Sequence, residues 1–380
     1  MLPLVLDIVL ATLSFPSVDA LDNGLERTPA MGWNPYNAFL CDTNEAQYHA
    51  AAQALAQSGL PKLGYKYFNI DCGWQGTNRT ADGVFTWNTT RIPSGIPALA
   101  SYVHDLGLDF GVYSDAGYFS CDFVGGTAGW LGSLNHEQSD ADTFASWGAD
   151  YLKYDNCYAV SPTDFVDMNP PISLEPHFTA MRDALNSTGR PIVFSVCEWG
   201  VQDPARWASE VGNSWRVSND IGPPPSWDNL VRIINQVVPI TQFASPGAFN
   251  DLDLLEVGNQ GLTTAEQETH FAFWAAAKSP LFISTDLTTA TKETLSILSN
   301  PGIIALNQDV LGKSIGFKRR YTNDSDIWAG PLADNSTAVV IINWQNVSRP
   351  VTFYLSDVGF SAADATNVRT QEFLGTLRDS

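Results

Sequence analysis

Short apolar segments recur along the chain up to residue 286, and each ends in an acidic residue or a polar turn. There are eight, at 30–34, 67–71, 109–115, 151–155, 192–198, 215–220, 248–251 and 281–286. Stretches with helical patterning separate them, at 45–58, 96–106, 140–147, 176–186, 227–237 and 266–277. Strands alternating with helices predict right-handed crossovers and a parallel sheet. Eight such units predict a (β/α)8 TIM barrel whose active site lies at the carboxyl ends of the strands.

The pattern changes after residue 312. Three β-rich runs, at 326–330, 338–344 and 351–355, are separated by turns rich in Asn, Asp, Ser and Gly. They predict an antiparallel β-sandwich domain packed beside the barrel. We therefore expect a catalytic barrel over 21–312 and a C-terminal domain over 313–380 that is incomplete. A sheet that lacks its last strands would leave an edge exposed.

The first residues predict export from the cell. An apolar run over 4–13 precedes Val18-Asp19-Ala20, which indicates a secretory signal peptide over 1–20. No Lys or Arg precedes the run and Asp7 interrupts it, so the alternative is an unstructured tail. A secreted, extracellular protein would carry glycans, and six Asn-x-Ser/Thr sequons occur, at Asn78, Asn88, Asn186, Asn323, Asn335 and Asn346.

Composition restricts the possible partners. The net charge of −21, from 41 acidic and 20 basic residues, disfavours nucleic acids and anionic membranes. The five cysteines include no Cys-x-x-Cys pair, which argues against zinc and thiol redox chemistry and allows two disulfides. The chain has no His-Glu-x-x-His, G-x-S-x-G, phosphate-loop or GxGxxG motif. We expect no metal and no cofactor, and the oligomeric state is not predicted.

Hydrolysis would then depend on carboxylates, and two strand ends provide a pair. Asp155 ends the segment 151–155, where the period of two places Lys153 on the same side. Asp220 follows Arg216 by four residues, so this pair also shares a side. Two carboxyl groups across a glycosidic bond can hydrolyse it without a metal. In each case the alternative is a structural ion pair.

Other polar and aromatic residues lie at the same predicted edge. Asp71 and Glu198 end neighbouring strands and could hold sugar hydroxyls. The aromatic residues Trp33, Tyr36 and Tyr113 also lie at strand ends. A single aromatic residue is more often part of the core, but several on one rim favour a carbohydrate substrate.

Several motifs stand in the order and spacing of a known family. They are Thr28-Pro29-Ala30-Met31-Gly32-Trp33-Asn34, Asp71-Cys72-Gly73-Trp74, Leu152-Lys153-Tyr154-Asp155-Asn156-Cys157, Cys197-Glu198-Trp199, Trp215-Arg216-x-x-x-Asp220 and Asn307-Gln308-Asp309. In these the chain resembles the α-galactosidases of glycoside hydrolase family 27, the fungal secreted type above all. The resemblance implies a retaining exo-α-galactosidase that acts on oligosaccharides or galactomannans.

The resemblance also implies roles for individual residues. Asp155 would be the nucleophile and Asp220 the acid/base. Asp71, Lys153, Arg216 and Glu198 would bind galactose hydroxyls, Glu198 that at carbon 2, and Tyr113 would line the pocket. The implied disulfides are Cys121–Cys157 and Cys41–Cys72, which leaves Cys197 free.

One departure from the family pattern keeps alternatives open. Many members have a second Asp where this chain has Cys72, and that Asp lies near the sugar 6-hydroxyl. A β-L-arabinopyranosidase is therefore an alternative, because its sugar matches galactose without the 6-hydroxymethyl group. A truncated, inactive sugar-binding homologue is the alternative outside the enzymes.

Overall fold

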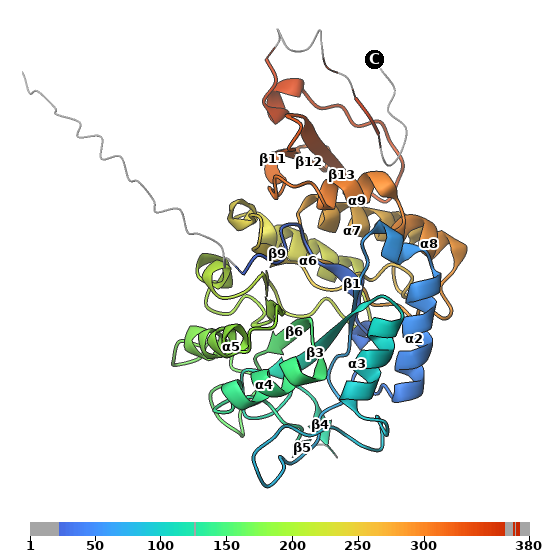
Figure 1. Ribbon diagram of the computed structural model, residues 1–380. Helices are drawn as coiled ribbons and strands as arrows, with labels where there is room; N and C mark the ends of the chain where they lie inside the picture. The colour runs from blue at the N-terminus through green and yellow to red at the C-terminus, as the bar shows by residue number, and fades with distance from the viewer. Residues whose placement is uncertain (1–22, 125–126, 362–367, 369, 373–380) are drawn as a thin grey trace, which may run out of the picture.

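The computed structural model describes residues 23–124, 127–361, 368 and 370–372, and its centre is a closed parallel barrel (Figure 1). The strand order is β10-β1-β2-β3-β6-β7-β8-β9. Leu255, just after β9, pairs in parallel with Ile283 of β10 and brings the two ends of the sheet together. The predicted TIM barrel is confirmed. Its strands are β1 (Met31–Trp33), β2 (Tyr67–Asn69), β3 (Asp109–Asp115), β6 (Tyr151–Asp155), β7 (Val193–Val196), β8 (Ser214–Arg216), β9 (Phe249–Asp251) and β10 (Leu281–Ile283).

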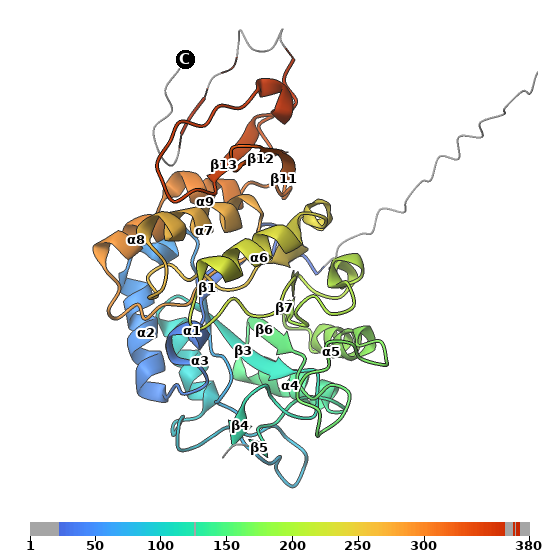
Figure 2. The ribbon, with the colours of Figure 1, turned by 180° about the vertical axis from the view of Figure 1, so that it is seen from behind.

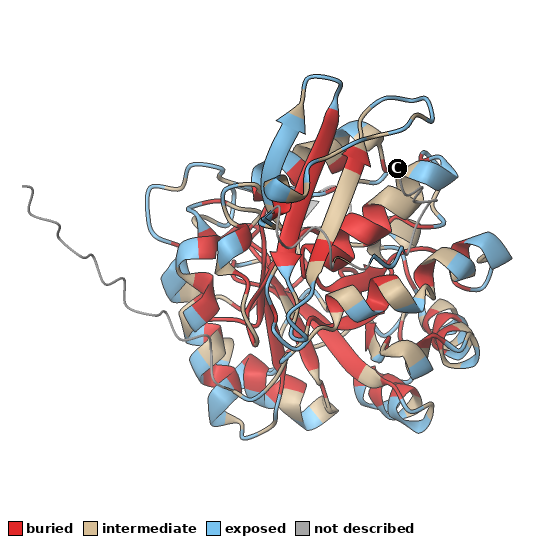
Figure 3. Ribbon diagram, turned by 90° about the horizontal axis from the view of Figure 1, so that it is seen from above, coloured by how far each residue is buried: buried red, intermediate tan, exposed pale blue. Residues whose placement is uncertain are grey.

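Helices surround the strands, with their inner faces buried and their outer faces exposed (Figure 3). Capping boxes begin two of them, formed by Asn44 with Gln47 and by Thr263 with Glu266. All six predicted helices are present. The helices are α1 (Tyr36–Phe39), α2 (Glu45–Gln57), α3 (Ile96–Asp105), α4 (Glu137–Trp147), α5 (Glu175–Ser187), α6 (Trp227–Val237), α7 (Thr264–Ala276), α8 (Lys292–Leu298) and α9 (Pro301–Asn307).

The start of α4 differs from the prediction. We expected Ser139 to cap a helix from residue 140, but α4 begins at Glu137, after His136. The Ser139 hydroxyl donates to the carbonyl of His136 at 3.0 Å and does not accept from later amides. Ser139 therefore lies inside the first turn of the helix.

The strand predicted over 215–220 is also shorter than expected. β8 ends at Arg216, because side chains occupy the carbonyl groups that follow. Arg216 Nη2 donates to the carbonyl of Ser218 at 3.0 Å, and Arg232 Nη2 donates to that of Asp220 at 3.0 Å. Asp220 consequently lies in the loop after the strand. The loop after β3 carries a small hairpin of β4 (Phe123–Val124) and β5 (Thr127–Ala128).

The C-terminal sheet has strands β11 (Gly316–Tyr321), β12 (Ser325–Pro331) and β13 (Thr337–Asn343), paired antiparallel. The prediction missed β11 because this edge strand is mostly exposed and carries three consecutive basic residues, 318–320. The strand predicted over 351–355 was wrong. The amide of Tyr354 donates to Tyr321 Oη and Asp357 Oδ2, and Leu355 begins a short 3-10 helix, η5 (Leu355–Val358).

The C-terminal sheet lies beside the barrel helices, as Figures 1 and 2 show, and aromatic contacts join the two. The ring of Trp328 packs edge-on against Phe273 of α7, with centroids 5.0 Å apart. Trp344, just after β13, lies 6.0 Å from Trp227 of α6. The domain boundary at residue 312 stays a prediction.

The predicted signal peptide over 1–20 lies outside the described residues. Within the described ranges, no helix combines the length and the hydropathy that spanning a bilayer requires.

Candidate active site

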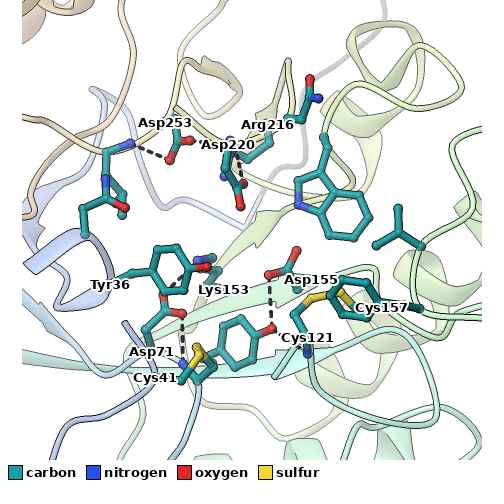
Figure 4. A pocket seen from close by; sticks show the side chains of 18 of the residues that line it. Tyr36, Cys41, Asp71, Cys121, Lys153, Asp155, Cys157, Arg216, Asp220 and Asp253 are labelled. Carbon is teal, nitrogen blue, oxygen red and sulfur yellow. Dashed lines mark hydrogen bonds and ion pairs between the residues drawn. A yellow bond between two sulfur atoms is a disulfide. The ribbon is translucent and has the colours of Figure 1, made fainter. Parts of the chain in front are cut away.

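A cavity of about 280 Å³ opens at the carboxyl ends of the barrel strands (Figure 4). This volume is near the lower end of the range for small-molecule sites, roughly 300–1,000 Å³. The barrel brings together most of the residues that the sequence predicted. The predicted residues that line it are Tyr36, Asp71, Tyr113, Lys153, Asp155, Arg216 and Asp220.

Asp155 is held at the end of β6 by its pairing with β3, where Asp115 is its partner in the register. Its side chain is only 7% exposed, and its Oδ2 accepts a hydrogen bond from Tyr113 Oη at 3.1 Å. Its Oδ1 has no hydrogen-bond partner among the described residues. Burial raises the pKa of Asp155 to about 6; nearby Lys153 lowers that pKa, and Asp220 raises it. One oxygen of the Asp155 carboxyl group thus carries no hydrogen bond, and the other is held by Tyr113.

Lys153 supplies the positive charge beside this carboxylate. Its Nζ donates to Asp71 Oδ2 at 2.8 Å, and the same oxygen accepts from Asn34 Nδ2 at 2.7 Å. The ammonium lies 5.4 Å from the Tyr36 ring centroid and 5.3 Å from that of Tyr113. Burial is the largest single influence and lowers the pKa of Lys153, but the attractions of Asp71, Cys197 and Asp155 together outweigh it, so the pKa is raised. The floor of the cavity therefore keeps a buried cation between carboxylates.

Arg216 provides a second cation and joins two carboxylates. Its Nη2 lies 2.9 Å from Asp220 Oδ1 and 2.7 Å from Asp253 Oδ2. The Asp220 side chain is 49% exposed, whereas that of Asp155 is buried. Both carboxylates line the same cavity, with the charged residues converging on it in Figure 4. The pair thus consists of one carboxyl at the floor and one at the mouth.

Asp253 is a residue that the sequence patterns did not single out. It braces the loop after β8, because its Oδ2 accepts from the amide of Ile221 at 2.8 Å. It also lines the cavity. Burial raises the pKa of Asp253 to about 6; Arg216 opposes this rise and Asp220 adds to it. Its position two residues after the predicted strand 248–251 was the available signal.

Both predicted disulfides are present at the rim. Cys121–Cys157 and Cys41–Cys72 have Cα–Cα distances of 5.0 and 4.8 Å, and all four cysteines line the cavity. Cys197 is free and buried, with Arg216 Nη1 donating to its Sγ at 3.6 Å. Among the described residues, two clusters of cysteine and aspartate side chains have the spacing of metal ligands, and both include a disulfide-bonded pair. A bridged sulfur is not a thiolate, and the thiolate is the form of cysteine that binds metals.

Two predicted site residues do not line the cavity. Trp33 belongs to the core: its Nε1 donates to the carbonyl of Thr285 at 2.9 Å and its ring stacks on Phe68. Glu198 is fully buried, and neither of its carboxylate oxygens has a hydrogen-bond partner among the described residues. Burial, with a smaller contribution from Asp203, raises the pKa of Glu198 to about 10. The next residue, Trp199, lines the cavity in its place.

Comparisons with known proteins agree with this chemistry. A family model described as "Alpha galactosidase A" matches residues 28–309, and one described as "Alpha galactosidase C-terminal beta sandwich domain" matches 322–373. "Alpha-galactosidase D" of Emericella nidulans is 46% identical over 365 residues, which is 95% of this chain. The chain spans only 55% of that relative's length.

Solved structures are similar as well. Alpha-galactosidase I from Mortierella vinacea is 39% identical with a TM-score of 0.77, covering 85% of this chain and 83% of its own. An α-galactosidase from Saccharomyces cerevisiae, solved with raffinose, is 34% identical with a TM-score of 0.80. That match covers 90% of this chain and 79% of the yeast chain.

Proposed function

Because the chain belongs to the glycoside hydrolase family 27 α-galactosidases, we propose that it removes terminal α-linked D-galactose from oligosaccharides or galactomannans. The observation that carries this proposal is the pair Asp155 and Asp220 in one cavity. Each has a cation nearby: Lys153 on β6 with Asp155, and Arg216 in contact with Asp220.

The proposed reaction is a double displacement with retention. Asp155 attacks the anomeric carbon while Asp220 protonates the leaving oxygen, and the bond to the leaving group breaks as the glycosyl–enzyme bond forms. Asp220 then takes a proton from a water molecule. The water oxygen attacks the anomeric carbon, and the bond between that carbon and Asp155 breaks. The position of Asp155 in the cavity lining suits attack, and the exposure of Asp220 suits proton exchange with solvent.

The floor of the cavity supports cleavage from the chain end. Asp71 and Lys153 form a hydrogen-bonded ion pair that is almost completely buried, and it can bind the hydroxyls of one sugar ring. A floor closed in this way would admit a terminal residue and exclude the middle of a polysaccharide. We also propose that Glu198 binds the 2-hydroxyl of galactose. Glu198 does not line the cavity, so this role requires its side chain to move into the cavity.

We further propose that the protein is secreted and glycosylated. Five of the predicted glycosylation sites, Asn78, Asn186, Asn323, Asn335 and Asn346, are exposed, and Asn88 is half-buried. Two disulfides are typical of proteins that mature in an oxidising compartment.

One observation favours β-L-arabinopyranosides as a second class of substrate. Cys72 lines the cavity and its sulfur is bonded to Cys41, so this position provides no carboxylate for a 6-hydroxyl group. A sugar without the 6-hydroxymethyl group would lose no contact there.

The test is the turnover of nitrophenyl α-galactoside and nitrophenyl β-L-arabinopyranoside by the whole chain and by Asp155→Asn. We expect the variant to lose about a thousandfold or more in kcat/KM, because an amide is a poor nucleophile. Asp82→Asn, an exposed carboxylate outside the cavity, is the matched control and should keep full activity. If Asp155→Asn keeps more than about a tenth of the wild-type rate, Asp155 is not the nucleophile.

A further inference from the structure

The loop between β6 and α5 carries an unusual set of exposed apolar side chains. Phe165, Val166, Met168 and Ile172 are 39%, 37%, 54% and 46% exposed. Single exposed apolar residues need no explanation, but a cluster on one loop marks a contact surface. Three of the four, Phe165, Val166 and Met168, line the same cavity as Asp155 and Asp220.

The loop is anchored at both ends, so its apolar segment is presented in a defined place. At the first end, the amide of Tyr158 donates to the carbonyl of Phe165 at 2.8 Å, next to the bridged Cys157. The Tyr158 and Phe165 rings lie 5.4 Å apart. At the other end, Gln202 Nε2 donates to the carbonyl of Ile172 at 2.7 Å.

The cavity is divided by polarity. Its floor holds buried charges, with Asp71 and Asp155 almost inaccessible to solvent, whereas the apolar loop and Asp220 are at least one-third exposed. In the proposed reaction Asp220 donates its proton to the leaving oxygen, so the leaving group extends outward from the floor. It must then pass the exposed part of the cavity lining.

We infer that Phe165, Val166 and Met168 form a binding site for the leaving group and favour α-galactosides whose leaving group presents an apolar face. This inference rests on the proposed function, because it takes Asp220 as the acid. An aromatic ring and the face of a sugar ring that carries C–H groups both present such an apolar surface. Removing apolar surface from water would provide the selectivity.

The test compares three substrates of the whole chain: nitrophenyl α-galactoside, melibiose and methyl α-galactoside. The double variant Val166→Ser/Met168→Ser should lower kcat/KM for nitrophenyl α-galactoside about tenfold relative to methyl α-galactoside, mainly through KM. The loss of an apolar contact of about one methylene changes the ratio of kcat/KM between two substrates by roughly 10–200-fold. A parallel loss on melibiose identifies the sugar face as the natural ligand, and a loss on the nitrophenyl substrate alone identifies an aromatic one.

The matched control is Ile172→Ser, which changes an exposed apolar residue on the same loop outside the cavity lining. Ile172→Ser should leave the ratios of kcat/KM between the three substrates unchanged. For the double variant, the rate on methyl α-galactoside serves as the check that the protein is folded. Unchanged ratios in the double variant, or an equal change in the control, would overturn the inference. If the wild-type chain hydrolyses none of the three substrates, the proposed function itself has failed.

Discussion

At the scale of single residues, Glu198 shows how burial without a partner alters a carboxyl group. Its side chain is fully buried, and no described residue gives it a hydrogen bond. The folded state therefore favours the protonated form, with a pKa of about 10 against the ordinary 4.5. The folded chain binds this proton more tightly than the unfolded chain. The resulting stability is fully present below pH 4.5 and is lost as pH rises toward 10.

Glu198→Gln should remove this pH dependence, because the amide has a similar shape and cannot ionise. We expect the variant to be more stable than the wild type at pH 8, with a gap that shrinks toward pH 5. The gap should change by up to about 1.4 kcal/mol per pH unit. Thermal unfolding at the two pH values measures it, with the exposed Glu210→Gln as control. An equal effect at both pH values would show that Glu198 does not hold a proton in the folded chain.

The local residue pattern predicted part of the site. Alternation along one strand was enough to place Lys153 with Asp155. The residue pattern could not predict that Arg216 contacts Asp253 as well as Asp220. Asp253 follows a different strand, and closure of the barrel brings it next to Arg216. Trp33 was predicted at the rim and lies in the core, since a strand-end position does not fix where a side chain points.

At the scale of elements, the loops after β3 and β6 are joined beside Asp155. Cys121 is bonded to Cys157, two residues after Asp155. Asp115 reinforces this junction, because its Oδ1 accepts from the amide of Gly117 at 2.9 Å and its Oδ2 from that of Cys157 at 3.1 Å. The junction keeps the two loops in one arrangement around the cavity.

Cys157→Ser should therefore lose activity at a temperature where its circular dichroism spectrum still shows folded structure. Misplacing a nucleophile by about 1 Å can cost about a hundredfold in rate. The double variant Cys121→Ser/Cys157→Ser should lose about as much as the single one, because either change breaks the same bond. Peptide mapping without reductant should recover the linked pair from the native protein. Two alkylatable thiols there would rule the bridge out.

Elements with a clear apolar run or helical pattern were predictable, and those without one were not. The eight barrel strands are short apolar runs and the six predicted helices are stretches with helical patterning, and all of them are present. The strand β11 has no such run, because both of its faces are largely exposed. The segment 351–355 has the period of a strand, yet side chains of Tyr321 and Asp357 bind the amide of Tyr354. Competition of this kind between side chains and a strand ladder depends on tertiary contacts.

At the scale of the whole molecule, the barrel closes through Leu255 and gathers charges from widely separated segments. The amide of Leu255 donates to the carbonyl of Phe282 at 2.7 Å and so joins the last strand to the loop after β9. This closure brings Asp253 and Arg216 into the cavity that holds Asp71 and Lys153. The repeating strand–helix order predicts such closure, but it does not predict which residue completes it.

The central claim is that Asp155 and Asp220 cleave an α-galactoside in two displacements. Proton NMR of the sugar first released from nitrophenyl α-galactoside by the whole chain tests it most directly. Each displacement inverts the anomeric carbon, so two of them restore its configuration. We predict that α-galactose appears first and then equilibrates with the β-anomer. Initial release of β-galactose would contradict a covalent intermediate on Asp155.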